Sequence, residues 1–317
     1  MNTAPILAQN DMGENHHVVM SSGGIGSYAA ARRTADKYGT GNLTLLFTDV
    51  IIESGDLYRF LVETSCNIFS RPAPEELLSW WRTVPEYHQD PGARAAALVT
   101  LREEMRDIVP ELVWLADGRS PWQVFADKRF LGNARRDPCS DILKRKLADR
   151  WLIANCNPLN TIVHVGIDWT EEHRYVRLGG LRALEGWRYE APMCDAPFIM
   201  KDAMFALLAL EGIRPPILYG QGFSHNNCGG FCIKAGIGHF VMLFHVNPEL
   251  YAFCEQEEQR IIALIGKPVG ILTDRRGGKR VPMTMRHLRE RIEAGEKFDR
   301  FDLGGCGCFS GMEDDEQ

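Results

Sequence analysis

A short apolar run that ends in a glycine-rich turn and continues into a helix is the feature that most constrains the fold of this chain. Residues 17–20 are typical of a strand, the turn reads Ser21-Ser22-Gly23-Gly24-Ile25-Gly26-Ser27, and residues 28–38 are rich in alanine and arginine and predict a helix. Two further apolar runs, 43–48 and 161–167, end at Asp49 and Asp168. This alternation of strands and helices predicts an α/β fold with a parallel sheet, whose binding sites are expected at the carboxyl ends of the strands.

The rest of the sequence divides into regions around this core. Residues 1–15 are polar and without periodicity and are expected to be disordered, and residues 16–235 are expected to form the main domain. Residues 72–127 carry helix-forming, charged sequence between prolines and predict a helical insertion. Residues 236–317 predict a helical C-terminal region that ends in a Gly- and Cys-rich tail. Individual helices are expected at 201–210, 232–245, 248–264 and 284–294.

The composition excludes several classes of protein. The 317 residues are 45% hydrophobic and 25% charged, which is ordinary for a globular chain and argues against a disordered or fibrous one. The formal charge of −6 argues against a surface coated in positive charge for bulk nucleic-acid binding. The longest apolar stretches are far shorter than the roughly 18 residues of a membrane span, and no signal-peptide core is visible at the N-terminus. We expect a soluble, cytoplasmic protein with no membrane partner.

The nine cysteines fall into two groups. Four stand singly among apolar residues, where a small buried side chain is the expected role. The other five lie in loops rich in glycine, proline or asparagine, and loop thiolates at short spacing can converge on a metal ion. These five are Cys139, Cys228, Cys232, Cys306 and Cys308.

The glycine-rich turn is suited to holding phosphate, because its glycines let backbone N–H groups approach oxygen atoms and the following helix presents its positive end. The turn resembles the Ser-Gly-Gly-x-Asp-Ser pyrophosphate loop of the adenine-nucleotide alpha-hydrolase-like (PP-loop) superfamily, with Gly26 in place of the aspartate. The resemblance implies a Rossmann-like PP-loop fold that binds ATP or adenylyl sulfate with Mg²⁺. The binding residues that it assigns to the turn are Ser22, Gly23, Gly24, Gly26 and Ser27.

Further segments, within residues 17–235, are similar to the phosphoadenosine phosphosulfate reductase branch of that superfamily. They are 46–49, 137–144, 166–174 and the run from Ala191-Pro192-Met193 to Cys228-Gly229-Gly230-Phe231-Cys232. The resemblance implies that Asp49 approaches the adenosine. It also implies that residues after the third apolar run face the nucleotide, namely Gly166, Asp168, Glu172 and Arg174.

Iron–sulfur members of this branch hold a [4Fe-4S] cluster with four thiolates, and the resemblance assigns three of them to Cys139, Cys228 and Cys232, with Ser140 at the fourth position. Three ligands would leave one iron open for hydrosulfide, as in the tRNA thiolases of the superfamily. Cys306 or Cys308 as the fourth ligand is the competing arrangement. A structural Zn²⁺ site remains the alternative to iron.

The tail cysteines also have a catalytic interpretation. Cys306 and Cys308 are similar in position to the C-terminal catalytic cysteine of the reductases, where a thiolate attacks sulfur. His225, which precedes Asn226-Asn227-Cys228, is a candidate general acid or base, with loop stabilisation as its other role. Basic residues gather at 128–150 around Cys139 and suit sulfate, phosphate or a nucleic-acid backbone, or form a solvated face. Trp80, Trp81 and Trp122 are expected to pack within the helical insertion rather than to stack on bases.

Three functions follow from these expectations. In the first, a sulfurtransferase adenylates its substrate with ATP and then inserts sulfur. In the second, an oxidoreductase reduces adenylyl sulfate or its 3′-phosphate to sulfite, and in the third a nucleotide- or redox-sensing protein binds without catalysis. The missing loop aspartate weakens the first, and the missing fourth cysteine weakens the second. The expected partners are an adenine nucleotide, a sulfur- or electron-donor protein and a nucleic-acid substrate at the basic patch; a homodimer is compatible with this interpretation.

Overall fold

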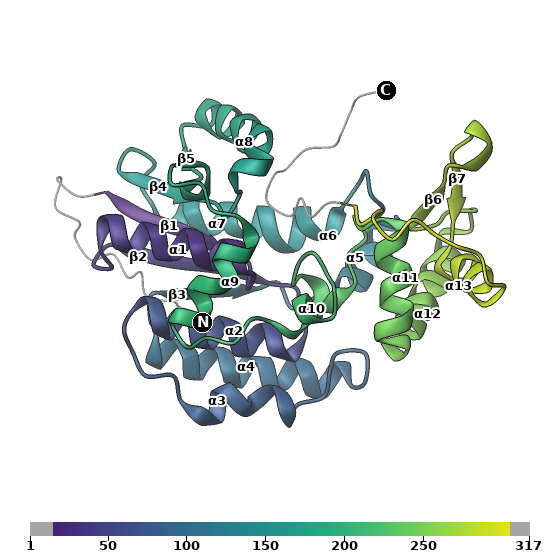
Figure 1. Ribbon diagram of the computed structural model, residues 1–317, viewed down its shortest axis with the longest axis horizontal. Coiled ribbons are helices and arrows are strands. Elements are labelled where there is room, and N and C mark those ends of the chain that lie inside the picture. The colour runs from purple at the N-terminus through teal and green to yellow at the C-terminus, as the bar shows by residue number, and fades with distance from the viewer. Residues whose placement is uncertain (1–14, 305–317) are drawn as a thin grey trace.

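A five-stranded parallel sheet forms the centre of the computed structural model, which describes residues 15–304 (Figure 1). The strands are β1 (His16–Ser21), β2 (Leu43–Asp49), β3 (Leu112–Ala116), β4 (Thr161–His164) and β5 (Arg188–Glu190). They lie in the order β3-β2-β1-β4-β5, and each neighbouring pair is parallel. The predicted α/β class with a parallel, Rossmann-like sheet is therefore confirmed.

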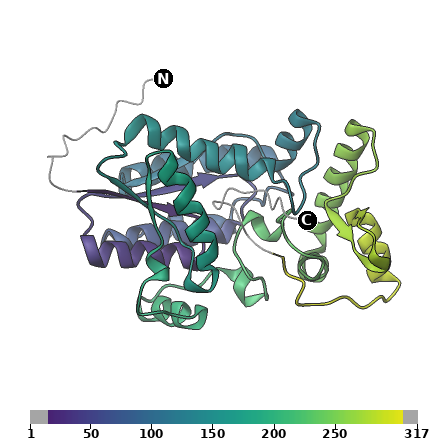
Figure 2. The ribbon, with the colours of Figure 1, turned by 90° about the horizontal axis from the view of Figure 1, so that it is seen from above.

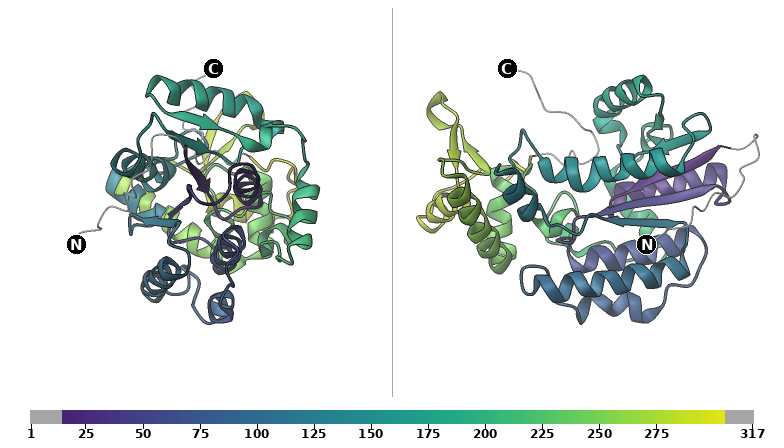
Figure 3. Two further views of the ribbon diagram at one scale, coloured as in Figure 1. Left: turned by 90° about the vertical axis from the view of Figure 1, so that its left-hand side faces the viewer. Right: turned by 180° about the vertical axis from the view of Figure 1, so that it is seen from behind.

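Helices cover both faces of this sheet, which explains why its strands are continuously apolar rather than alternating (Figure 3). On one face, α1 (Ile25–Tyr38), α2 (Gly55–Ile68) and α4 (Pro91–Ile108) pack on Val19, Leu45 and Phe47. On the other, α7 (Lys146–Asn155) and α8 (Glu172–Leu184) pack on Val18, Leu46 and Val163. Neighbouring residues of one strand thus enter two different cores.

The segment 72–127, predicted as a helical insertion, is instead part of the sheet domain. It contains α3 (Glu75–Ser79), the short turn η1 (Trp80–Arg82) and α4, as the helical pattern indicated. After α4 the chain forms β3, which pairs with β2, and then α5 (Pro121–Lys128). The apolar run Leu112–Ala116 supplies the edge strand of the sheet, so the segment completes the domain.

The C-terminal region forms a helical layer beside the carboxyl ends of the strands (Figure 2). The helices predicted for this region are observed as α11 (Ile237–Val246), which begins five residues later than predicted, α12 (Pro248–Ile265) and α13 (Met285–Glu293). The helix predicted at 201–210 is α9 (Lys201–Leu210), which packs in the core of the sheet domain with α1 and α2. A hairpin that the sequence did not predict, β6 (Leu272–Asp274) and β7 (Val281–Met283), joins α12 to α13. Phe240, Tyr251 and Leu288 share one core with Trp122 and Phe125 of α5, so this layer is continuous with the sheet domain.

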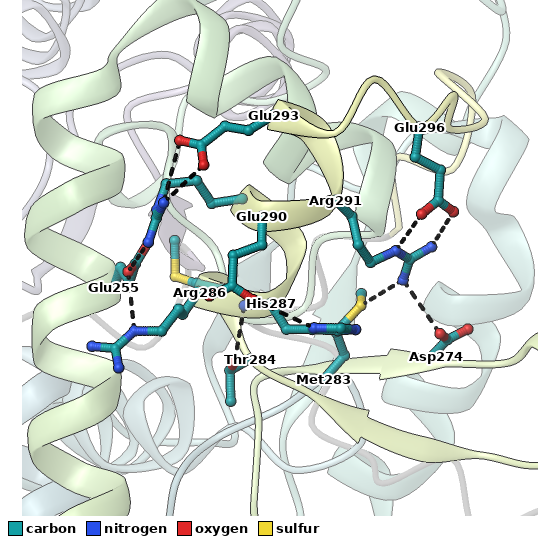
Figure 4. A network of polar contacts seen from close by, with 12 residues as sticks. Glu255, Asp274, Met283, Thr284, Arg286, His287, Glu290, Arg291, Glu293 and Glu296 are labelled. Atoms are coloured by element: carbon teal, nitrogen blue, oxygen red, sulfur yellow. Dashed lines mark hydrogen bonds and ion pairs between the residues drawn. The ribbon is translucent and has the colours of Figure 1, made fainter.

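Ion pairs fix α13 against α12 and the hairpin (Figure 4). Glu255 accepts hydrogen bonds from Arg289 at 2.8 Å and from Arg286 at 3.5 Å. Arg291 pairs with Glu296 and, at 3.3 Å, with Asp274. Most of these side chains are partly exposed, so their ion pairs contribute little to stability. We infer that they mainly fix the orientation of α13.

Two buried histidines meet within the sheet. His17 Nδ1 and His164 Nε2 lie 2.9 Å apart, and the rings stack with centroids 5.2 Å apart. Burial lowers the pKa of His164 to about 3, with the neighbouring His17 as the next cause, and it also lowers the pKa of His17. The pair is therefore held neutral in the folded protein.

This pair predicts a loss of stability in acid. The unfolded His164 binds its proton near pH 6.5 and the folded one only near pH 3, so between these values the unfolded state takes up more protons. The free energy of unfolding should fall by about 1.4 kcal/mol for each pH unit below 6.5 from this group alone. Urea unfolding between pH 7.5 and 4.5 measures the slope. His164→Gln should flatten it while His173→Gln, at an exposed position of α8, should not; equal slopes in wild type and His164→Gln would contradict the assignment.

Candidate functional site

Three segments far apart in the sequence converge on one cleft at the carboxyl ends of β1 and β4. It encloses about 760 Å³. Its walls come from the turn after β1, the connection from β4 to α8, and the residues 219–227. They are Met20, Ser22, Gly24, Gly26, Ser27, Val165, Gly166, Ile167, Glu171, Arg174, Tyr219, His225, Asn226 and Asn227. The strands β2 and β3 are added on one side of β1, and β4 and β5 on the other. Ligands of open parallel sheets bind where the strand order switches in this way, here between β1 and β4.

The predicted phosphate turn is held by its own serines. Ser27 Oγ accepts from Ser22 N at 3.1 Å and donates to the Gly24 carbonyl at 2.8 Å. Gly23 has a φ of 71°, and a Cβ there would lie 2.7 Å from Leu57. In the described chain no side chain caps α1 at Gly24, and Ile25 N lies 3.3 Å from the Tyr219 hydroxyl. The positive end of α1 therefore opens into the cleft.

Gly26 of the phosphate turn packs against a second glycine, Gly166. A Cβ at Gly26 would lie 3.3 Å from the Gly166 carbonyl oxygen. A Cβ at Gly166 would lie 2.9 Å from both Cα and N of Ser27. The backbone at the end of β4 thus lies directly against the turn, and this close approach accounts for glycine at both positions.

The β4–α8 connection contributes two cleft residues of opposite charge. Arg174 forms an ion pair with Glu171, and both line the cleft. Of the other predicted residues, Asp168 caps the turn η3 (Trp169–Glu171) by accepting from Thr170 N at 2.9 Å, and Glu172 is exposed. Neither belongs to the cleft wall. Glu171, one residue before the predicted Glu172, takes the position of the acidic group.

Asp49 does not reach the cleft. It is 1% exposed, and its carboxylate accepts from Tyr58 Oη at 2.7 Å, Ile51 N at 2.7 Å and Trp114 Nε1 at 3.0 Å. Burial raises the pKa of Asp49, and the three hydrogen bonds, which favour the charged carboxylate, offset only part of this increase. Ile51 has a φ of 60°, which is strained for a β-branched residue, so we assign Asp49 to holding this turn and not to contacting adenosine.

The loop before the cysteine pair completes the cleft. Asn226 Nδ2 donates to the Gly23 carbonyl at 2.8 Å and so ties this loop to the phosphate turn. His225 is half-buried, and in the described chain neither ring nitrogen has a hydrogen-bond partner. Burial is the main cause that lowers its pKa to about 3, and the charges of His239, Lys144 and Lys201 lower the pKa further. His225 therefore presents a neutral imidazole at the cleft.

A buried ion pair contacts the backbone of the cysteine loop. Lys144 Nζ lies 3.4 Å from Glu53 Oε1, and the two side chains are 4% and 0% exposed. Glu53 also accepts from the backbone N–H of Cys228. Lys144 comes from the π-helical turn η2 (Asp141–Arg145), which follows the short helix α6 (Pro138–Ser140) that carries Cys139.

The structure places the three predicted metal ligands in one region. Cys139 and Cys232 are buried in the same core cluster, and Cys228 packs against it. The Cys228 and Cys232 thiols form a hydrogen bond, and this contact, burial and the nearby Glu53 raise the pKa of Cys228 well above its usual value. Cys228, Gly229 and Gly230 all have positive φ values, of 56°, 62° and 93°.

Among residues 15–304, no group of three or more His, Cys, Asp or Glu side chains is arranged to hold a metal ion. Cys306 and Cys308 lie outside the described residues. Gly304, the last described residue, pairs with Ala235 only three positions after Cys232. We derive no chemical step through a metal.

The basic patch around Cys139 is neutralised in part, at three of its eight basic residues, while Lys128, Arg129, Arg135 and Arg150 are exposed. Arg145 pairs with Asp137 at 3.2 Å, and Lys146 pairs with Asp141 at 2.5 Å. Lys144 is buried on Glu53. The remaining surface therefore carries less positive charge than the sequence suggests, which weakens the expectation of a nucleic-acid backbone at this patch.

Sequence reasoning missed several residues of the site. Tyr219 and Lys201 lie between residues 191 and 232, but their place in the site was not predicted. Lys201 Nζ lies 4.7 Å from the centre of the Tyr219 ring and donates to the Ser224 carbonyl. Glu53 carries no sequence signal at all. Its role depends on Lys144, which is 91 positions away.

Comparison with models of protein families, with curated proteins and with solved structures gave no match. Within the described residues, none of the helices combines the length and apolar character needed to cross a membrane.

Proposed function

We propose that this protein is an enzyme that binds an adenine nucleotide in the cleft and carries out sulfur chemistry at the adjoining cysteine loop. The observation that carries the proposal is that the cleft wall and the cysteine loop are formed by consecutive residues of the chain. Residues 225–227 line the cleft that also contains the phosphate turn and Arg174, and the next residue in the chain is Cys228.

The charge of the cleft suits a phosphate or sulfate ester. Arg174 lines the wall, Lys201 and Lys144 lie close enough to lower the pKa of His225, and α1 contributes its amino terminus. Arginine binds such anions with paired, charge-assisted hydrogen bonds. The neutral His225 adds a group that can donate or accept a proton once a ligand is bound.

Two reactions fit this arrangement. In the first, ATP activates a substrate oxygen as its adenylate and a sulfur nucleophile displaces AMP. In the second, a thiolate attacks the sulfur of adenylyl sulfate and expels AMP, and a second thiol then attacks the resulting thiosulfonate, which forms a disulfide and releases sulfite. One observation favours the second: Glu171 is the single acidic residue among the described residues of the cleft wall, and it is paired with Arg174. A cleft of this kind neutralises an anion with cations and offers little to Mg²⁺.

The proposal is tested by nucleotide affinity. Arg174→Gln should weaken the binding of adenylyl sulfate or ATP about 10- to 100-fold, because a charge-assisted hydrogen bond contributes about 1.5–3 kcal/mol. Arg177→Gln, one turn further along α8 and exposed, is the matched control and should bind as wild type. Isothermal titration calorimetry measures both, with and without Mg²⁺.

Turnover separates the reactions. Formation of AMP from ATP supports adenylation, and formation of sulfite from adenylyl sulfate supports reduction. Binding without either product would indicate a non-catalytic nucleotide sensor. No binding of any adenine nucleotide, or equal affinity of the Arg174 and Arg177 variants, would refute the proposal.

A further inference from the structure

A second pocket adjoins the same cysteine loop and is not part of the nucleotide cleft. The space between its walls, including the solvent at its mouth, is about 750 Å³. Cys228, Gly229 and Phe231 lie in its wall, whereas His225, Asn226 and Asn227 line the cleft. Consecutive residues of one short loop thus face two separate cavities.

The left-handed backbone of this loop explains how it serves both. Cys228 has a φ of 56°, a conformation that costs a non-glycine residue about 1 kcal/mol or more and is seen mainly at functional sites. A Cβ on Gly229 would lie 2.7 Å from the Ile52 carbonyl oxygen, so the loop is pressed against the segment that carries Glu53. Together with the Glu53 hydrogen bond to its N–H, this packing fixes Cys228 between the two cavities.

Aromatic side chains from distant parts of the chain surround the second pocket. Trp81, Tyr87 and His88 come from the segment before α4, and Phe253 comes from α12. The Tyr87 and Phe253 rings lie 6.1 Å apart, edge to face. Trp81, Tyr87, His88 and Phe253 are all partly exposed, so their faces are accessible to a ligand.

Polar and charged groups accompany these rings. Gln221 and Asn247 also line the pocket, and an amide offers both hydrogen-bond donors and an acceptor. Arg214 and Arg82 lie over the Trp81 ring, at 5.8 Å and 5.5 Å from its centre. Arg214 also pairs with Asp56 at 2.6 Å, and Asp56 and Glu86 line the pocket. Stacking faces and amide groups are the combination by which proteins hold an unpaired nucleobase.

We infer that this second pocket binds a nucleobase, supplied as a free nucleoside or nucleotide or by a single strand, and presents it to Cys228. The inference goes beyond the proposed function, because neither of the two reactions by itself requires a base in this pocket. Binding of the base in the pocket is a separate property and is testable without turnover.

The experiment measures binding of pyrimidine and purine nucleosides, and of a short single-stranded RNA, to the full chain by calorimetry. Phe253→Ala should weaken binding about 5- to 150-fold, the usual effect of removing one aromatic partner of a stacked base. Phe198→Ala is the matched control, because Phe198 is 61% exposed and lies outside the pocket. Gln221→Ala, at an exposed loop position, provides a second variant that does not disturb packing if Phe253→Ala fails to fold.

The two proposals fail separately. Pyrimidine nucleoside or RNA affinity that falls with Phe253→Ala or Gln221→Ala but not with Arg174→Gln supports the second pocket, and preference for nucleoside or strand identifies the source of the base. No binding of any probe, or losses equal to those of Phe198→Ala, would overturn it. Loss of adenylyl sulfate binding in Arg174→Gln alone bears only on the cleft.

Discussion

Replacing Lys144 with methionine is expected to lower the free energy of unfolding by about 3–5 kcal/mol. The change leaves the Glu53 carboxylate, which is fully buried, without its ammonium partner at 3.4 Å. The hydrogen bond from the Cys228 N–H remains but does not neutralise the charge. Urea denaturation at pH 7.5 measures the loss.

Two further variants show whether the buried charge is the cause. Lys144→Met combined with Glu53→Gln should recover most of the stability, because the amide oxygen still accepts from Cys228 N and no charge is left buried. Lys146→Met is the control: its side chain is 65% exposed, so its pair with Asp141 should be worth less than about 1 kcal/mol. Equal effects at positions 144 and 146 would mean that the pair does not stabilise the loop.

The elements that the sequence predicted are those whose signals are local. The strand, turn and helix from residue 17 to residue 38 read directly from an apolar run, glycines and an alanine-rich helix, and the structure has β1 and α1 there. The helix at 201–210 was likewise predicted with its observed bounds. For such segments the spacing of apolar residues along the chain is sufficient to predict the secondary structure.

The parts that were missed depend on pairing over long distances. β3 was absorbed into a helical insertion because five apolar residues between helices do not reveal a partner, and only pairing with β2 makes them an edge strand. Asp49 ends a strand, as binding residues of this fold do, yet its carboxylate is taken up by Tyr58, Ile51 and Trp114. Strand position is visible in a sequence, whereas the direction of one side chain is not.

The candidate site divides in the same way. Four of the five predicted residues of the phosphate turn line one cleft with Gly166, Arg174 and His225, whereas Gly23 is not in its wall. Asp168 does not line it, because its carboxylate caps the turn η3. Glu172 does not line it either, and the residues of this segment that do are Glu171 and Arg174. The aromatic pocket was not foreseen, since Trp81 and Phe253 are 172 positions apart.

The second large effect is expected at Gly166. A valine there would place its Cβ 2.9 Å from the Cα and N atoms of Ser27, and backbone atoms cannot move aside as a flexible side chain can. The end of β4 and the phosphate turn must separate, which opens the cleft wall on both sides of the ligand. We expect Gly166→Val to reduce adenylyl sulfate or ATP affinity more than 100-fold and to cost about 1–3 kcal/mol of stability by overpacking.

Gly180→Val provides the matched control for this last prediction. Gly180 lies in α8, and a Cβ there would meet no atom within 4 Å, so nucleotide affinity and stability should stay close to wild type. Calorimetry with adenylyl sulfate and ATP measures the affinities, and circular dichroism confirms that each variant is folded. Wild-type affinity in a folded Gly166→Val protein would contradict the assignment, because a phosphate group could not then lie between the turn and the end of β4. A loss confined to Gly166→Val would instead locate the ligand at the contact between Gly166 and the phosphate turn.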